Sequence, residues 1–127
     1  MNISKLVMVG LGGFAGSVCR YIVFETSAKL FKTPFIPYGT LLVNVAGCLL
    51  IGFFGGLIES KALFSPEIRA LVLIGFLGGF TTYSTFGYEL LLILRQGQTA
   101  AFIAHTGAHL IFGLFAVFCG FTLSKAM

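Results

Sequence analysis

The chain has 127 residues, of which 57% are hydrophobic and only 9% are charged, and its mean hydropathy is +1.02. A soluble domain of this length could not shield so much apolar surface from water, so the composition excludes a water-soluble fold and favours lipid as the solvent. The formal net charge is +4, but the basic residues are dispersed along the chain, which argues against a nucleic-acid partner.

Four apolar runs are long enough to cross a bilayer, which takes roughly 20 residues that each rise about 1.5 Å along a helix. They cover residues 6–24, 38–58, 70–94 and 99–123. Because these runs use almost the whole chain, we expect one all-α transmembrane domain over residues 1–127, without a separate soluble domain.

The basic residues divide evenly between the two sides of the membrane. With four spans, both termini and the middle link lie on one side, together with Lys5, Lys61, Arg69 and Lys125. The other side holds Arg20, Lys29, Lys32 and Arg95. An even division gives the positive-inside rule almost nothing to act on. Either the protein inserts in both orientations, or one of these boundaries is displaced by a charged residue.

Three of the apolar runs carry glycines four positions apart, at Gly12 and Gly16, at Gly52 and Gly56, and at Gly75 and Gly79. This small-x-x-x-small spacing lets two transmembrane backbones approach closely. We expect tight helix packing at these glycines, either within one protomer or between two.

Two polar residues stand out in the first half of the chain. Arg20 lies near the end of the first run, where it either lines a water-filled vestibule that attracts anions or anchors the helix at the interface. Asn44 lies about two turns into the second run. Its amide either offers N–H donors to an anion or makes a hydrogen bond between helices.

The third run contains glycines and hydroxyl residues in the string Gly78-Gly79-Phe80-Thr81-Thr82-Tyr83-Ser84-Thr85-Phe86. Such a string predicts an interrupted helix at membrane depth. An unpaired backbone group costs several kcal/mol in hydrocarbon, so an interruption survives only inside protein or along a watery cavity. Interrupted membrane helices often form the binding site for a small solute or ion, which indicates transport.

Three further polar residues lie in the later spans. Glu89 is placed toward the carboxyl end of the third run, where we interpret it as a near-surface helper together with Thr40, rather than as a proton-coupling group. His105 and His109 share one face of the fourth span. They either line a polar pathway, form hydrogen bonds with the third span, or bind zinc, although no third zinc ligand is evident.

The string in the third run, taken with Arg20, Asn44 and Glu89, resembles the bacterial fluoride channel family often called Fluc. The resemblance covers the chain from end to end, and the Gly-Gly-x-Thr-Thr-aromatic-Ser-Thr-Phe pattern is specific. It implies four transmembrane helices per subunit with a broken third helix. It also implies an antiparallel homodimer, made by dual insertion into the cell's inner (plasma) membrane. Each dimer would contain two fluoride pores.

The family's functional positions carry over to this chain residue by residue. A structural sodium ion at the dimer centre would be held by the backbone carbonyls of Gly78 and Thr81. The fluoride pathway would comprise Arg20, Asn44, Tyr83, Ser84, Thr85, Phe86, His105 and His109, with Thr40 and Glu89 as helpers. Neutral amide and hydroxyl donors bind an anion without trapping it, and ring edges carry the positive end of the aromatic quadrupole.

The chain departs from the family's pattern at four positions. Tyr83 stands where phenylalanine is usual, His105 where tyrosine is expected, His109 where a small polar residue is expected, and Gly113 where serine is common. A protonated imidazole would add charge beside the pathway. These departures bear on rate and pH dependence rather than on the identity of the ion.

We therefore expect a passive fluoride channel that exports fluoride and lowers its toxicity in the cytoplasm, and not an enzyme, because no nucleophile–base pair is visible. The alternative is a small dual-topology antiporter for cationic compounds. That class needs a glutamate in the first span, where this chain has Arg20. A structural subunit without transport would explain the glycines but not the hydroxyl-rich string.

Overall fold

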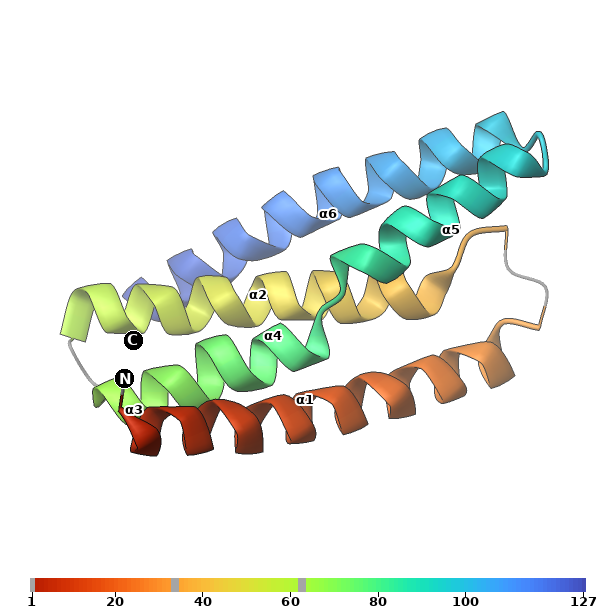
Figure 1. The fold of residues 1–127 in the computed structure, drawn as a ribbon. Helices are drawn as coiled ribbons and strands as arrows, with labels where there is room; N and C mark the ends of the chain where they lie inside the picture. Colours follow the sequence, from red (N-terminus) through yellow and green to blue (C-terminus); the bar gives the residue numbers. More distant parts are fainter. Residues whose placement is uncertain (1, 33–34, 62–63) are drawn as a thin grey trace.

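The computed structural model describes residues 2–32, 35–61 and 64–127, and every regular element in these ranges is a helix (Figure 1). Four helical runs in the described residues are long and apolar enough to cross a membrane. They are α1 (Ile3–Leu30), α2 (Tyr38–Lys61), the run Pro66–Arg95 and α6 (Thr99–Lys125). The prediction of an all-helical protein with four membrane-spanning segments is confirmed.

The run Pro66–Arg95 consists of several segments. It begins with α3 (Pro66–Arg69), which Ser65 caps and Pro66 opens, and continues through the π-helical η1 (Ala70–Phe76) into α4 (Leu77–Phe80). The last segment, α5, covers Tyr83–Arg95. Between α4 and α5, Thr81 (φ −85°, ψ 161°) and Thr82 (φ −152°, ψ 114°) have extended backbone. These two residues are called the Thr81–Thr82 linker below.

The third span changes its neighbour at this linker. Its first half, η1 and α4, packs along α1, whereas α5 packs against α6 (Figure 1). Helix α2 completes the bundle by packing extensively against α6 and more lightly against α1. Figure 1 also shows the N and C marks at the same end of the bundle as α3. The linker therefore lies where the chain crosses from one helix pair to the other.

The spaced glycines are the points of closest approach between helices. A Cβ atom on Gly12 or Gly16 of α1 would overlap the backbone of η1 and α4, and Gly75 faces α1 in return. On the other side of the bundle, Gly52 of α2 and Gly120 of α6 each face the backbone of the partner helix. The glycine spacing thus allows close packing between helices of the same protomer. This was one of the two interpretations of the spacing, the other being packing between two protomers.

Candidate functional site

Asn44 pairs with the backbone of the Thr81–Thr82 linker. Its side-chain oxygen accepts from the Thr82 backbone N–H at 2.8 Å, and its amide nitrogen donates to the Thr82 carbonyl at 3.0 Å. An extended residue inside a helical span has no helical partner for these groups, so Asn44 supplies both. The second amide N–H of Asn44 has no hydrogen-bond partner among the described residues.

Arg20 contacts the linker from α1. Its guanidinium donates to the Thr81 carbonyl at 3.2 Å, and the side chain is only partly exposed. Helix α1 continues beyond Arg20 to Leu30, so the helix extends past the apolar run in which Arg20 lies. The guanidinium therefore reaches the interruption of the third span from the middle part of α1.

The linker also changes hydrogen bonding in the preceding turn. In a continuous helix the Thr82 N–H would donate to the Gly78 carbonyl, four residues earlier. Here that N–H donates to Asn44, so the Gly78 carbonyl loses its helical donor. Gly78 is exposed, and a Cβ atom there would meet nothing within 4 Å.

The start of α5 gathers hydroxyl groups. The Thr82 hydroxyl caps the helix by accepting from the Thr85 backbone N–H at 3.3 Å, and it donates to the Thr85 hydroxyl oxygen at 2.9 Å. The Ser84 hydroxyl lies 3.4 Å from the Thr82 hydroxyl. Because the Thr85 oxygen acts as an acceptor, its own O–H proton remains available for a ligand.

A groove of about 440 Å³ lies beside the linker, between α2, α4, α5 and α6. Its wall is mostly apolar, with polar positions at Asn44, Thr81, Thr82, Tyr83 and His109. Tyr83 is 85% exposed at the rim. A mostly apolar hollow with a few converging donors is the usual form of a binding site for a small ligand.

An aromatic cluster forms the α5–α6 side of this groove. The ring centroid of Phe86 lies 4.2 Å from His109, 5.4 Å from His105 and 6.0 Å from Tyr83. The two histidine rings are 4.5 Å apart and nearly perpendicular. Four of the predicted pathway residues therefore form one cluster, and Phe86 is at its centre.

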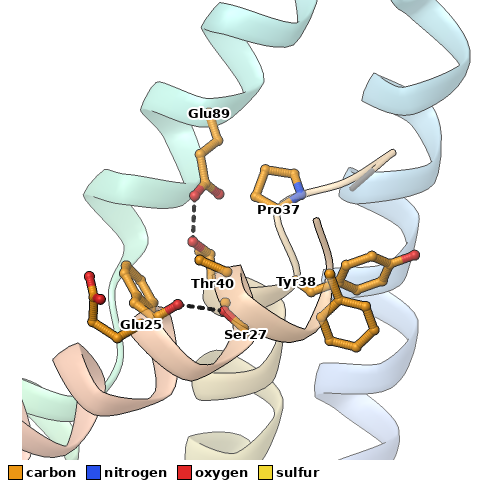
Figure 2. A pocket seen from close by; sticks show the side chains of 10 residues that line it. Glu25, Ser27, Pro37, Tyr38, Thr40 and Glu89 are labelled. Carbon is orange, nitrogen blue, oxygen red and sulfur yellow. Dashed lines mark hydrogen bonds between the residues drawn. The ribbon is translucent and has the colours of Figure 1, made fainter. Parts of the chain in front are cut away.

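Glu89 joins three helices next to this cluster. Its carboxylate accepts from the Thr40 hydroxyl of α2 at 2.5 Å, and its other oxygen lies 3.2 Å from His105 Nε2 of α6. The His105 side chain is fully buried and the Glu89 side chain is 18% exposed, so the carboxylate is mostly enclosed by protein. Figure 2 shows the carboxylate pointing toward Thr40 in a second hollow of about 310 Å³.

The structure brings the predicted site residues into two connected groups. Asn44, Thr81 and Arg20 meet at the linker, while Phe86, His105 and His109 meet beside Glu89. In the described part of the chain, no three His, Cys, Asp or Glu side chains come together as a metal-ligand group, so the histidine pair lacks such a third ligand for zinc.

Sequence reasoning missed two contacts. Thr82 was not among the candidate residues, although a threonine directly before a helical run is an N-cap signal that would have indicated it. The bond from Arg20 to Thr81 joins residues 61 positions apart and has no local sequence signal.

These features define a multi-pass integral membrane protein with a polar, interrupted span beside a groove. A family model described as "CrcB-like protein, Camphor Resistance (CrcB)" matches residues 7–121. The chain belongs to this family, the CrcB or Fluc family, as the Fluc resemblance predicted.

Curated proteins named "Fluoride-specific ion channel FluC" are similar to nearly the whole chain. The protein from Maridesulfovibrio salexigens is 39% identical over 95% of both chains, and that from Chlorobaculum tepidum is 42% identical over 98% of both. The protein from Aquifex aeolicus is 40% identical over 94% of this chain and 95% of its own. Ion channels are not enzymes, so the prediction that this chain is not an enzyme is confirmed.

Proposed function

We propose that this protein is a fluoride-specific ion channel of the plasma membrane that lets fluoride leave the cytoplasm passively. The observation that carries the proposal is the set of neutral donors around the linker, in a chain whose relatives are named fluoride-specific channels. The free amide N–H of Asn44 and the O–H of Thr85 are such donors. The antiporter alternative has no support from the relatives.

The chemistry of fluoride favours this set of groups. Fluoride is small and strongly hydrated, so a pore must replace its water donors one by one. Hydroxyl and amide groups do so without a fixed positive charge, which lets the ion leave again. The edge of the Phe86 ring adds a weakly positive surface beside them.

We further propose that two copies assemble as an antiparallel homodimer after insertion in both orientations. The even division of the basic residues supports dual insertion. The exposure of Tyr83 and Gly78 beside the groove leaves room for a second copy to cover the interrupted part of the third span.

A structural sodium ion is proposed at the dimer centre, held by the Gly78 and Thr81 carbonyls. Carbonyl oxygens are suitable ligands for a hard cation. The Gly78 carbonyl has lost its helical donor and the residue is exposed, which fits this role. The Thr81 carbonyl accepts from Arg20 but has a second lone pair.

The fluoride proposal is tested with purified protein in liposomes, where valinomycin and a potassium gradient drive anion efflux. We expect a fluoride electrode to register rapid efflux, and a chloride electrode to register none above protein-free liposomes. Equal fluoride and chloride efflux would contradict the proposal.

The dimer and the sodium ion need separate measurements. Labelling of a single cysteine at a terminal tag from outside intact cells should modify about half of the copies if both orientations insert; labelling of all or none would contradict dual insertion. Protein purified without sodium, and assayed with N-methylglucamine in its place, should lose fluoride efflux that sodium restores. Unchanged efflux would contradict the sodium site.

A further inference from the structure

His109 has a defined tautomer in its neutral form. Its Nδ1 lies 3.0 Å from the backbone carbonyl of His105. A carbonyl only accepts hydrogen bonds, so Nδ1 must carry the proton and donate. The other ring nitrogen, Nε2, is then a bare lone pair in the neutral ring. This atom is buried and has no hydrogen-bond partner among the described residues.

The surroundings of His109 leave this lone pair without a hydrogen-bond donor in the described part of the chain. The ring stacks at 4.2 Å on Phe86 and lines the groove that Asn44 also lines. The Thr40 carbonyl of α2 faces the same ring. A neutral His109 therefore keeps an unpaired acceptor buried near the Thr40 carbonyl and beside a groove proposed to hold an anion. One added proton turns Nε2 into a donor and places a positive charge beside that groove.

The other titratable and charged groups around His109 lie on its own helix and on the helices packed against it, α2 and α5. Glu89 of α5 and His105 of α6 are near the ring, and Tyr83 of α5 and Cys48 of α2 line the same groove, while Arg20 of α1 contacts the linker. Glu89 already accepts from Thr40 and pairs with His105. Among these groups, His109 alone combines a place on the groove wall with a buried nitrogen that has no partner.

We propose that His109 Nε2 is a proton-binding site linked to fluoride, so that the groove takes up a proton together with the anion. The linkage rests on the proposed fluoride function. It is reciprocal: the proton strengthens fluoride binding by placing a positive charge beside the groove, and bound fluoride strengthens proton binding equally. This chain would then bind fluoride more tightly as the pH falls.

The test measures the half-saturating fluoride concentration for efflux from liposomes between pH 6 and pH 8, with protein-free liposomes subtracted at each pH. For one linked proton, the wild-type value should fall by up to about tenfold per pH unit in the range where the ring titrates. His109→Gln keeps a neutral donor and His109→Ser a smaller one. Both should give values that change less than about twofold over the whole range.

Cys48→Ala is the matched control, because it removes a different titratable group from the same groove and should keep the wild-type pH dependence. A second readout does not depend on flux: fluoride added to weakly buffered, detergent-solubilised protein should cause proton uptake by wild type and not by His109→Gln.

The outcomes separate the two proposals. Wild-type efflux with a half-saturating concentration that does not change with pH, or pH dependence that persists in both His109 variants, would overturn the linkage and leave the fluoride channel intact. Absence of fluoride efflux at every pH would overturn the proposed function itself.

Discussion

Replacing Asn44 by aspartate keeps one of the two hydrogen bonds that hold the linker and removes the other. An ionised carboxylate still accepts from the Thr82 N–H, which is 2.8 Å away in the native protein. It cannot donate to the Thr82 carbonyl, so two acceptors face each other at the position of the present 3.0 Å bond. Leaving a partly buried acceptor unpaired costs about 1–3 kcal/mol, which corresponds to about 5- to 150-fold in an equilibrium constant.

The new charge acts on the anion as well. Two like unit charges about 4 Å apart repel by about 4 kcal/mol at an effective dielectric constant of about 20. Fluoride occupancy beside the ionised carboxylate that Asn44→Asp introduces would fall by about a thousandfold on that basis. We expect fluoride efflux from Asn44→Asp liposomes at neutral pH to fall at least tenfold, with the protein eluting from size exclusion at its native position.

Asn2→Asp is the matched control for this substitution. Asn2 caps α1 by accepting from the Ser4 backbone N–H at 3.0 Å, and aspartate caps a helix equally well. This variant should transport as wild type does. Wild-type efflux from Asn44→Asp would refute both the role assigned to the linker and the proximity of Asn44 to the fluoride pathway.

Further substitutions test the aromatic cluster, the carboxylate tether and the glycine packing. Phe86→Ile removes the ring edge and should reduce fluoride efflux more than tenfold while the protein elutes from size exclusion as wild type does; full efflux would remove this ring from the proposed pathway. Thr40→Val removes the donor to the partly buried Glu89 carboxylate and should cost about 1–2 kcal/mol in detergent unfolding, whereas Thr26→Val, on the exposed face of α1, should cost little. Gly16→Ala places a methyl against the backbone of the third span and should lower the unfolding temperature, whereas Gly10→Ala, which meets nothing within 4 Å, should not. Equal effects within either of these pairs would contradict the assigned contacts.

The four spans could be predicted from the sequence because the bilayer imposes a one-dimensional rule. Each crossing needs about 20 apolar residues, whatever the helices pack against. The helices extend beyond the predicted runs, for example to Leu30 in α1, because polar residues such as Lys29 continue a helix once it leaves the hydrocarbon. Hydropathy locates the apolar part of a span and not the ends of its helix.

The partners of the polar side chains could not be predicted in the same way. Asn44 and Thr82 are 38 positions apart, and the sequence left open whether the amide faces an anion or another helix. The structure shows that one face of the amide holds the linker, and its second N–H has no partner among the described residues. Similarly, hydrogen bonding to the third span was one of three interpretations for His105, and only the helix arrangement identifies Glu89 as its partner.

The interruption of the third span also follows from how the helices pack. A straight, continuous helix over Pro66–Arg95 could not pack its first half along α1 and its second half along α6, which lie on different sides of α2. Two extended residues allow the change of direction, and their exposed backbone groups need partners within the membrane. Asn44 from α2 and Arg20 from α1 provide them, but neither reaches back to Gly78. The same change of direction that places hydroxyl donors at the start of α5 therefore leaves a carbonyl acceptor at the end of α4. One interruption thus provides donors suited to an anion and an acceptor suited to a cation on neighbouring turns.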